Sequence, residues 1–162
     1  MIASMDIDNA LRQAISDLQA SYVACLDAGA FAEWPAFFTE DCHYRIVPRE
    51  NHDRGLPLAT IDLKGVGMLR DRVYGVQSTL FHGPYYQRHI IGPTRVISRE
   101  GDVINCETNY LVIRTKRDAP SDLFNAGRYL DRIMIAGDQL LFQQKICIFD
   151  SELVPNSLIY PI

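Results

Sequence analysis

The sequence predicts one α+β domain in which N-terminal helices cover a curved, mainly antiparallel sheet. Apolar residues in the first third recur at helical spacing, whereas the second half alternates with a period of two. No repeat or linker interrupts the 162 residues, a length typical of one domain, so we expect a single domain over residues 1–162. Helices followed by paired strands describe an α+β roll, because the apolar face of the sheet needs a cover.

An amphipathic helix is expected near the start of the chain. Its apolar face consists of residues spaced three or four apart: Ile7, Leu11, Ile15, Leu18, Tyr22 and Leu26. Gly29 follows, where a left-handed residue commonly ends a helix. A second, short helix is predicted over about Ala30 to Phe38, with Pro35 in its first turn.

The next segment mixes strand, loop and helix signals. Cys42 to Val47 alternates and predicts a strand, and the charged, Pro- and Gly-containing stretch from Pro48 to Pro57 predicts a long loop. A third helix is expected from about Lys64 to Val76, although three glycines weaken that pattern. Another loop runs through His82 to Pro84.

Four strands are expected after that loop, because β-branched and aromatic residues dominate and turn signals separate the segments. They are Tyr86–Ile97, Val103–Arg114, Phe124–Ile135 and Gln139–Phe149. In the second of them one face is mainly apolar: Ile104, Cys106, Thr108, Tyr110 and Val112. Short connections favour antiparallel pairing, and only the N-terminal helices are available to cover that face.

Composition disfavours several classes of partner. The net charge is −4 and no basic stripe is present, which argues against nucleic acid. No stretch approaches the ~20 apolar residues of a membrane span, and Met1 to Asp8 lacks the pattern of a secretory signal. The four cysteines are scattered and form no disulfide or zinc pattern. A cytoplasmic protein is therefore expected.

No motif for a nucleotide, a flavin or a metal is present. The glycine-rich dinucleotide and phosphate loops and the serine elbow are all missing. His82, His89 and Asp150 are the only candidates for an iron site made of two histidines and a carboxylate, but their spacing matches no ligand motif and structural histidines explain them better. We therefore expect no cofactor or metal in this chain.

An acid–base pocket is the main rival interpretation. Its candidate residues, which could converge inside the curved sheet, are Asp41, His43, Tyr44, His89, Tyr110 and Asp131. A buried carboxylate or histidine beside tyrosine hydroxyls can transfer protons on small organic substrates. The simpler alternative places Asp41 after the second helix and pairs Asp131 with Arg128 or Arg132 on the solvent side of the sheet.

Two segments suggest a protein interface. The last ten residues combine many apolar side chains with two prolines that rule out a helix, so they lie extended either on the chain's own sheet or on a partner. Tyr85, Tyr86 and Arg88 follow a proline turn and have the side-chain types common in interface hot spots. The predicted interface residues are Tyr85, Tyr86, Arg88, Leu153, Pro155, Leu158, Ile159 and Tyr160.

Short residue patterns spread over the chain resemble the small (β) subunits of bacterial aromatic-ring-hydroxylating oxygenases, particularly the salicylate-hydroxylase type. The patterns are Asp27 with Trp34-Pro35-x-Phe37-Phe38, Asp41-x-x-Tyr44-Arg45, Pro48-Arg49-Glu50-Asn51, Arg70-Asp71-Arg72-Val73, Tyr86-Gln87-Arg88-His89 and Asp150-Ser151-Glu152-x-x-Pro155-Asn156-Ser157. The resemblance implies an NTF2-like (cystatin-like) cone and no catalytic residue in this subunit.

The same resemblance implies a non-catalytic structural subunit that acts in the degradation of aromatic compounds. Its partner would be an α subunit in an α3β3 hexamer with β–β trimer contacts. That α subunit would hold a Rieske [2Fe–2S] cluster and a mononuclear iron, with NAD(P)H reducing equivalents arriving through a separate reductase. The alternatives are a stand-alone NTF2-like isomerase or dehydratase and a homo-oligomeric binding module.

Overall fold

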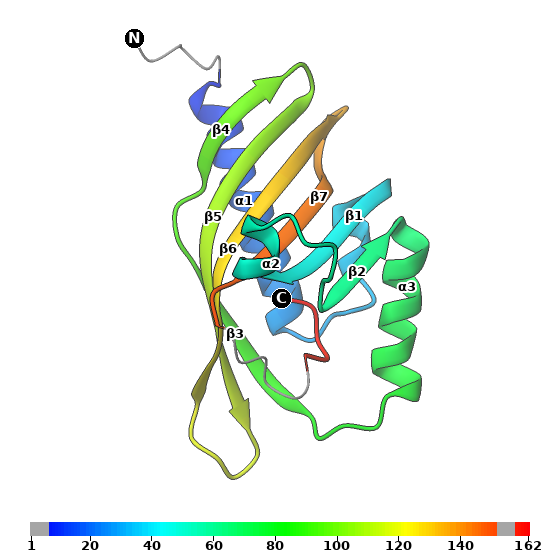
Figure 1. Ribbon diagram of the computed structural model, residues 1–162. Helices are drawn as coiled ribbons and strands as arrows, with labels where there is room; N and C mark the ends of the chain where they lie inside the picture. The colour runs from blue at the N-terminus through cyan, green and yellow to red at the C-terminus, as the bar shows by residue number, and fades with distance from the viewer. Residues whose placement is uncertain (1–6, 152–157) are drawn as a thin grey trace.

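The computed structural model describes residues 7–151 and 158–162, and within them seven strands form one curved sheet. The strands are β1 (Phe38–Pro48), β2 (Ile61–Lys64), β3 (Tyr85–Ile91), β4 (Arg95–Glu100), β5 (Val103–Lys116), β6 (Asp122–Ala136) and β7 (Gln139–Phe149). The helices are α1 (Asn9–Asp27), α2 (Arg49–Asp53) and α3 (Val66–Tyr74), with a 3₁₀ turn over Trp34–Phe37 and a π-helical turn over Gly75–Thr79. Figure 1 shows α1 running along one face of the sheet and α3 standing beside β2.

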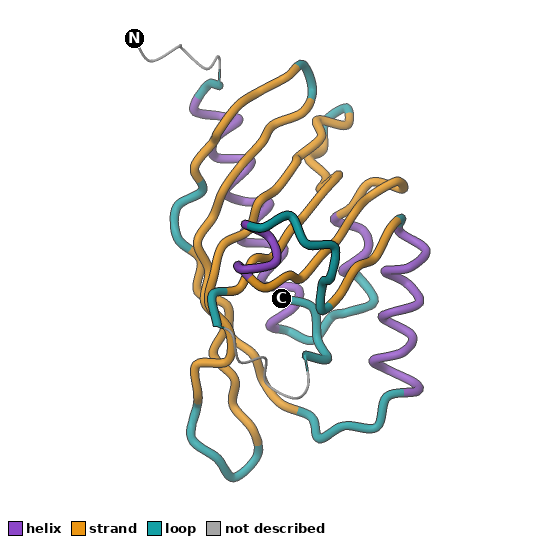
Figure 2. The backbone as a smooth tube through the Cα atoms, in the orientation of Figure 1, coloured by secondary structure: helices purple, strands orange, loops and turns teal. Residues whose placement is uncertain are grey.

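The strand order is β2-β1-β7-β6-β5-β3, with β4 also paired to β5. Only the β1–β7 pair is parallel; the other pairs are antiparallel. Figure 2 shows the strands as one strongly curved layer. The predicted α+β roll with a mainly antiparallel sheet is confirmed, and all five residues predicted for the apolar face of the second long strand are buried. No helix in the described segments is long and apolar enough to cross a membrane.

The first helix begins and ends with the signals in its sequence. The Asp8 carboxylate accepts a hydrogen bond from the Leu11 amide at 2.7 Å, which satisfies one of the free donors of the first turn. Gly29 adopts a φ of +69°, the left-handed conformation expected just past the last turn. The face that carries Ile15, Tyr22 and Leu26 is buried against the sheet.

The predicted second helix over Ala30 to Phe38 is wrong. Only Trp34–Phe37 is helical, as a 3₁₀ turn with Pro35 near its start, and Phe38 is already extended at φ −118°. Phe38 pairs with Phe142 of β7, so tertiary strand pairing ends the turn. The strand predicted from Cys42 therefore begins four residues earlier.

The predicted loop over Pro48 to Pro57 contains a short helix, α2, and β2 follows it unpredicted. Five residues give too little periodicity for a helix to be recognised. Both ends of α2 have ion-pair partners: Arg49 pairs with Asp150, just after β7, at 2.7 Å, and Asp53 lies 3.8 Å from the Arg128 guanidinium of β6. The predicted third helix is confirmed in shortened form as α3, with Gly65 preceding it at φ +78°.

The single strand predicted over Tyr86 to Ile97 is two strands. Gly92, Pro93 and Thr94 interrupt it, because Pro93 has no amide hydrogen to donate. Gly92 still donates to the Asn109 carbonyl at 2.8 Å, and both halves pair with β5. One long strand, β5, therefore spans β3 and β4.

Candidate functional site

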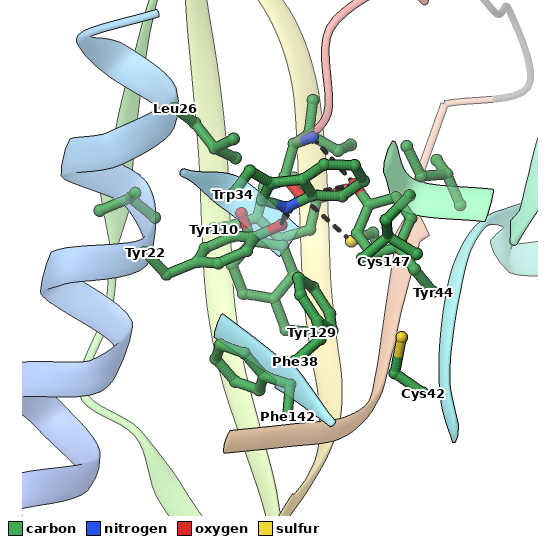
Figure 3. Packing of buried hydrophobic residues seen from close by; sticks show 14 of the residues in the cluster. Tyr22, Leu26, Trp34, Phe38, Cys42, Tyr44, Tyr110, Tyr129, Phe142 and Cys147 are labelled. Carbon is green, nitrogen blue, oxygen red and sulfur yellow. Dashed lines mark hydrogen bonds between the residues drawn. The ribbon is translucent and has the colours of Figure 1, made fainter. Parts of the chain in front are cut away.

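The interior between α1 and the curved sheet is packed with aromatic side chains (Figure 3). Tyr22 of α1 lies at its centre, with edge-to-face contacts to Phe38, Tyr129 and Phe142 at 5.4–6.4 Å between ring centroids. Trp34 lies 5.0 Å from the Tyr44 ring and its indole Nε1 donates to the Tyr22 hydroxyl at 3.4 Å. Such pairs stabilise beyond the area that they bury.

A buried cation lies among these rings. The ammonium group of Lys145, on β7, is 3.8 Å from the Tyr129 ring centroid, 4.3 Å from Phe142 and 4.5 Å from Tyr22. It also donates to the Asp131 carboxylate on β6 and to Gln19 of α1, each at 3.2 Å. The side chains of Lys145 and Asp131 are both fully buried. The charge is therefore compensated by an ion pair and by three aromatic faces.

The Asp131 carboxylate also accepts a hydrogen bond from the side-chain amide nitrogen of Gln19 at 2.5 Å. Burial raises the pKa of the Asp131 carboxyl above its ordinary value, while Lys145 and Gln19 oppose that rise. The alternative in which Asp131 pairs with Arg128 or Arg132 on the solvent side is wrong. Strand alternation alone does not tell which face of β6 is buried. In the structure the Asp131 side chain points into the interior, beside Lys145.

The last residue of the chain enters the same interior. The Ile162 carbonyl accepts hydrogen bonds from the hydroxyls of Tyr22 and Tyr44, each at 2.9 Å. The Ile162 amide donates to the Tyr44 hydroxyl at 3.0 Å, and its side chain is fully buried. Burial raises the pKa of both tyrosines well above the ordinary value.

The residues before Ile162 are fixed to two elements of the chain, α3 and β3. The Arg72 guanidinium of α3 donates to the carbonyls of Leu158 and Ile159 at 3.1 and 2.7 Å, and Gln87 donates to the Pro161 carbonyl at 3.0 Å. The Tyr160 ring lies 4.4 Å from that of Tyr85. The sequence left two placements for the end of the chain, on its own sheet or on a partner. Residues 158–162 pack on the chain itself.

The interior therefore offers a filled core rather than an open ligand pocket. Its largest side chains, each less than 2% exposed, include Trp34, Tyr22, Tyr44, Tyr129, Phe142 and Lys145. Two cavities of about 460 and 570 Å³ lie outside it, around residues 81–86 and 115–117. Neither of these two cavities is lined by Lys145 or Asp131.

A second polar pair joins the end of α1 to β3. The Asp27 carboxylate accepts from the His89 backbone amide at 3.0 Å and lies 2.6 Å from the His89 Nδ1. The His89 side chain is fully buried, and its Nε2 has no hydrogen-bond partner among the described residues. A carboxylate that orients an imidazole in this way is the usual arrangement of a general base.

The predicted acid–base set is not brought together. Asp41 is exposed and accepts from the Thr39 hydroxyl, while His43 lies on the surface 2.6 Å from Asp62. His89 is held by Asp27 instead. Four residues of the set are buried, His89 among them, and the other three are Tyr44, Tyr110 and Asp131. Sequence reasoning missed Lys145 and Gln19, although a lone lysine within an apolar strand was a usable signal.

The described residues do not fit a metal. No group of three or more His, Cys, Asp or Glu side chains is arranged to hold one in residues 7–151 and 158–162. Each residue considered as a candidate iron ligand has another partner: His82 Nε2 lies 2.9 Å from the Tyr160 hydroxyl, His89 contacts Asp27, and Asp150 pairs with Arg49.

The predicted interface residues fall into three groups. Tyr86 and Arg88 are strongly exposed on β3: Tyr86 is 81% exposed, and the Arg88 side chain is 74% exposed. Tyr85, Leu158 and Ile159 are half-buried, and Tyr160 is buried within its own chain. Leu153 and Pro155 lie outside the described residues.

Comparison with known proteins shows the family to which the chain belongs. A model described as the SnoaL-like domain matches residues 9–144. The small subunit of anthranilate 1,2-dioxygenase from Burkholderia cepacia is 34% identical over 145 residues, which cover 90% of each chain. The chain belongs to the SnoaL-like family of dioxygenase small subunits. The predicted family and its NTF2-like fold are thereby confirmed.

Two further relatives agree with that membership. A β subunit of terephthalate 1,2-dioxygenase from Comamonas sp. is 28% identical and covers 91% of this small subunit and 96% of its own length. A crystal structure assigned as the β subunit of an aromatic-ring-hydroxylating dioxygenase from Novosphingobium aromaticivorans superposes with a TM-score of 0.87 at 35% identity. It covers 94% of this small subunit and 97% of its own chain.

Proposed function

We propose that this chain is the non-catalytic, structural small subunit of a multicomponent aromatic-ring-hydroxylating oxygenase in aromatic-compound degradation. The observation that carries the proposal is the filled interior, taken together with 34% identity to a dioxygenase small subunit over 90% of the chain. Among the described residues, Lys145, Asp131 and Ile162 fill the centre of the cone, where an enzyme of this fold would need space for a substrate.

Oxygen insertion belongs, in this proposal, to a large α subunit. That subunit holds a Rieske [2Fe–2S] cluster and a mononuclear iron, and a separate reductase supplies electrons from NAD(P)H. Residues 1–162 act as one β-subunit domain in an α3β3 assembly with β–β contacts. The assembly is cytoplasmic, which the free cysteines support because reducing compartments keep thiols unpaired.

Co-expression with the large subunit encoded alongside this chain tests the proposal. We expect one complex by size-exclusion chromatography with light scattering, iron only in preparations that contain the large subunit, and ring oxygenation only by that complex. A small subunit that never co-purifies with the large subunit would contradict the proposal. The mass of the complex decides between α3β3 and other stoichiometries.

A stand-alone isomerase or dehydratase is the second candidate, and the Asp27–His89 pair is the observation that favours it. The His89 Nε2 has the orientation of a base held by a carboxylate. This candidate predicts turnover of a small carbonyl or hydroxy compound by the isolated chain, abolished in His89→Gln. Absence of turnover together with normal assembly of His89→Gln supports the structural role.

A further inference from the structure

Two adjoining hollows form one groove at the surface, lined by the loop before β3 and the end of β5. Their volumes are about 460 and 570 Å³, and they share Pro84, Tyr85, Lys116 and Arg117. In Figure 1 the hairpin between β5 and β6 projects from the lower end of the sheet, beside β3. We call this feature the β3–β5 groove.

Large apolar side chains surround the groove without being covered. Phe81 is fully exposed and Tyr86 is 81% exposed, while Leu123 on the neighbouring strand β6 is 65% exposed. Phe81 and Tyr86 line the two hollows, one at each end. Exposed apolar side chains gathered in this way mark an interaction site more often than a free surface.

The groove also carries positive charge on a chain whose net charge is −4. Lys116 and Arg117 are consecutive and exposed at the end of β5. Of the acids nearest in sequence, Asp122 is engaged by the Arg114 guanidinium at 2.8 Å, and Asp118 lies in the exposed turn. An anionic group is therefore attracted to this end of the groove.

Contacts with residues 158–162 hold the groove in shape. The Tyr160 amide donates to the Tyr85 hydroxyl at 3.4 Å, and the His82 Nε2 lies 2.9 Å from the Tyr160 hydroxyl. Ile159 adds an apolar side chain to the wall. A preorganised surface of this kind loses little entropy when a partner binds.

We propose that the β3–β5 groove binds an extended segment of the large oxygenase subunit in which a carboxylate side chain lies beside an aromatic or aliphatic one. The carboxylate pairs with Lys116 and Arg117, and the apolar side chain packs between Phe81 and Tyr86. The inference rests on the proposed function, since it names where that partner docks.

Charge and shape favour this occupant over two others. A two-fold contact between two copies of this chain through the groove brings their Lys116 and Arg117 side chains together, and like charges repel. A three-fold β–β contact joins two different surfaces, and the concentration dependence measured below separates it from docking of the large subunit. A free small molecule is poorly enclosed, because both hollows are partly open to solvent, whereas ligand sites bury most of their ligand. A segment of a folded partner fits an open, mixed groove.

The test measures the affinity of the small subunit for the co-expressed large subunit at low and high salt. Lys116→Glu/Arg117→Glu should weaken binding about tenfold or more and remove most of its salt dependence. Phe81→Ser/Tyr86→Ser should weaken binding as strongly but keep the salt dependence. The matched control, Arg12→Glu/Arg132→Glu, reverses two exposed arginines outside the groove and should bind within about twofold of the wild type.

Each outcome has one meaning. A wild-type complex that tolerates both groove variants overturns the inference and leaves the proposed function intact, whereas failure of the wild type to bind overturns both. Amide hydrogen exchange supplies a second readout: residues 81–86 and 115–117 should gain protection only with the large subunit. Protection that instead grows with the concentration of the isolated chain assigns the groove to self-association and overturns the inference.

Discussion

The Tyr44 hydroxyl holds the main chain of Ile162 with two hydrogen bonds, donating to its carbonyl at 2.9 Å and accepting from its amide at 3.0 Å. The two residues are 118 positions apart. Ile162 occupies space in the core that an open cone would leave for a ligand. Closure of this interior therefore depends on the far end of the chain.

Replacing Tyr44 by Phe removes both hydrogen bonds and leaves the buried Ile162 amide without the acceptor that it has in the wild type. We expect the free energy of unfolding to fall by about 1–3 kcal/mol. Urea denaturation measures it. The control is Tyr74→Phe on α3, a residue that is 64% exposed and should change stability little. Equal stability of the two variants would show that Ile162 is not held in this way.

Replacing Lys145 by Met leaves the Asp131 carboxylate buried without its cation. The expected cost is about 3–5 kcal/mol near neutral pH. Pairing it with Asp131→Leu should recover most of that loss, because apolar residues of similar volume can replace a buried ion pair. A single Lys145→Met variant as stable as the double variant would contradict the ion-pair assignment.

The same variant predicts a pH dependence. Burial already raises the pKa of Asp131, and loss of Lys145, which opposes that rise, raises it further. A carboxyl whose folded-state pKa exceeds the unfolded value stabilises the fold below the unfolded pKa, and this stability is lost as pH rises through the folded pKa. The stability gap between Lys145→Met and the wild type should therefore narrow as pH falls toward 3.8, the ordinary aspartate value.

Gly127 of β6 has no room for a side chain. A Cβ at this position would overlap the Ile148 carbonyl oxygen and approach the Phe149 Cα to 2.9 Å. Gly127→Ala should thus destabilise the protein by about 3 kcal/mol or more, because backbone atoms of β7 must move. Gly67→Ala on α3 meets nothing within 4 Å and should stabilise by about 0.5–1 kcal/mol. Thermal unfolding of the two variants compares them directly.

Alkaline pH should unfold the protein cooperatively. Burial raises the pKa of the Cys106 and Cys147 thiols to about 12 and raises those of Tyr22, Tyr44 and Tyr129 well above 10.0. The unfolded chain loses these protons first, so stability falls as pH rises from about 9, by up to about 1.4 kcal/mol per pH unit for each proton. Cys147→Ala should reduce the loss of stability per pH unit by the contribution of about one proton. Urea denaturation at a series of pH values measures this loss, and a free energy of unfolding that stays constant up to pH 12 would contradict the prediction.

Long periodic segments and the turns between them are readable in the sequence. The helical face of Ile15, Tyr22 and Leu26, the left-handed Gly29 and the buried face of β5 all follow from local spacing. The bounds of β7 are predicted as observed. These features depend on residues close in the chain, where periodicity and backbone preference act directly.

Helices shorter than about two turns and strands shorter than about five residues are too short to be recognised from their periodicity. Residues distant in the chain contact both elements: Asp150 and Arg128 pair with the two ends of α2, and β1 pairs with β2. The interior site shows the same limit. Gln19, Asp131 and Lys145 lie up to 126 positions apart, so no spacing rule connects them.

The sequence by itself determined an α+β roll, the absence of nucleotide- and metal-binding motifs and the resemblance to dioxygenase small subunits, since these depend on composition and local pattern. Only the tertiary structure decided that the interior is filled and that the end of the chain closes it. Which face a strand buries and what fills the space beneath it depend on the volumes and polar groups of distant segments, which meet only when the chain is folded.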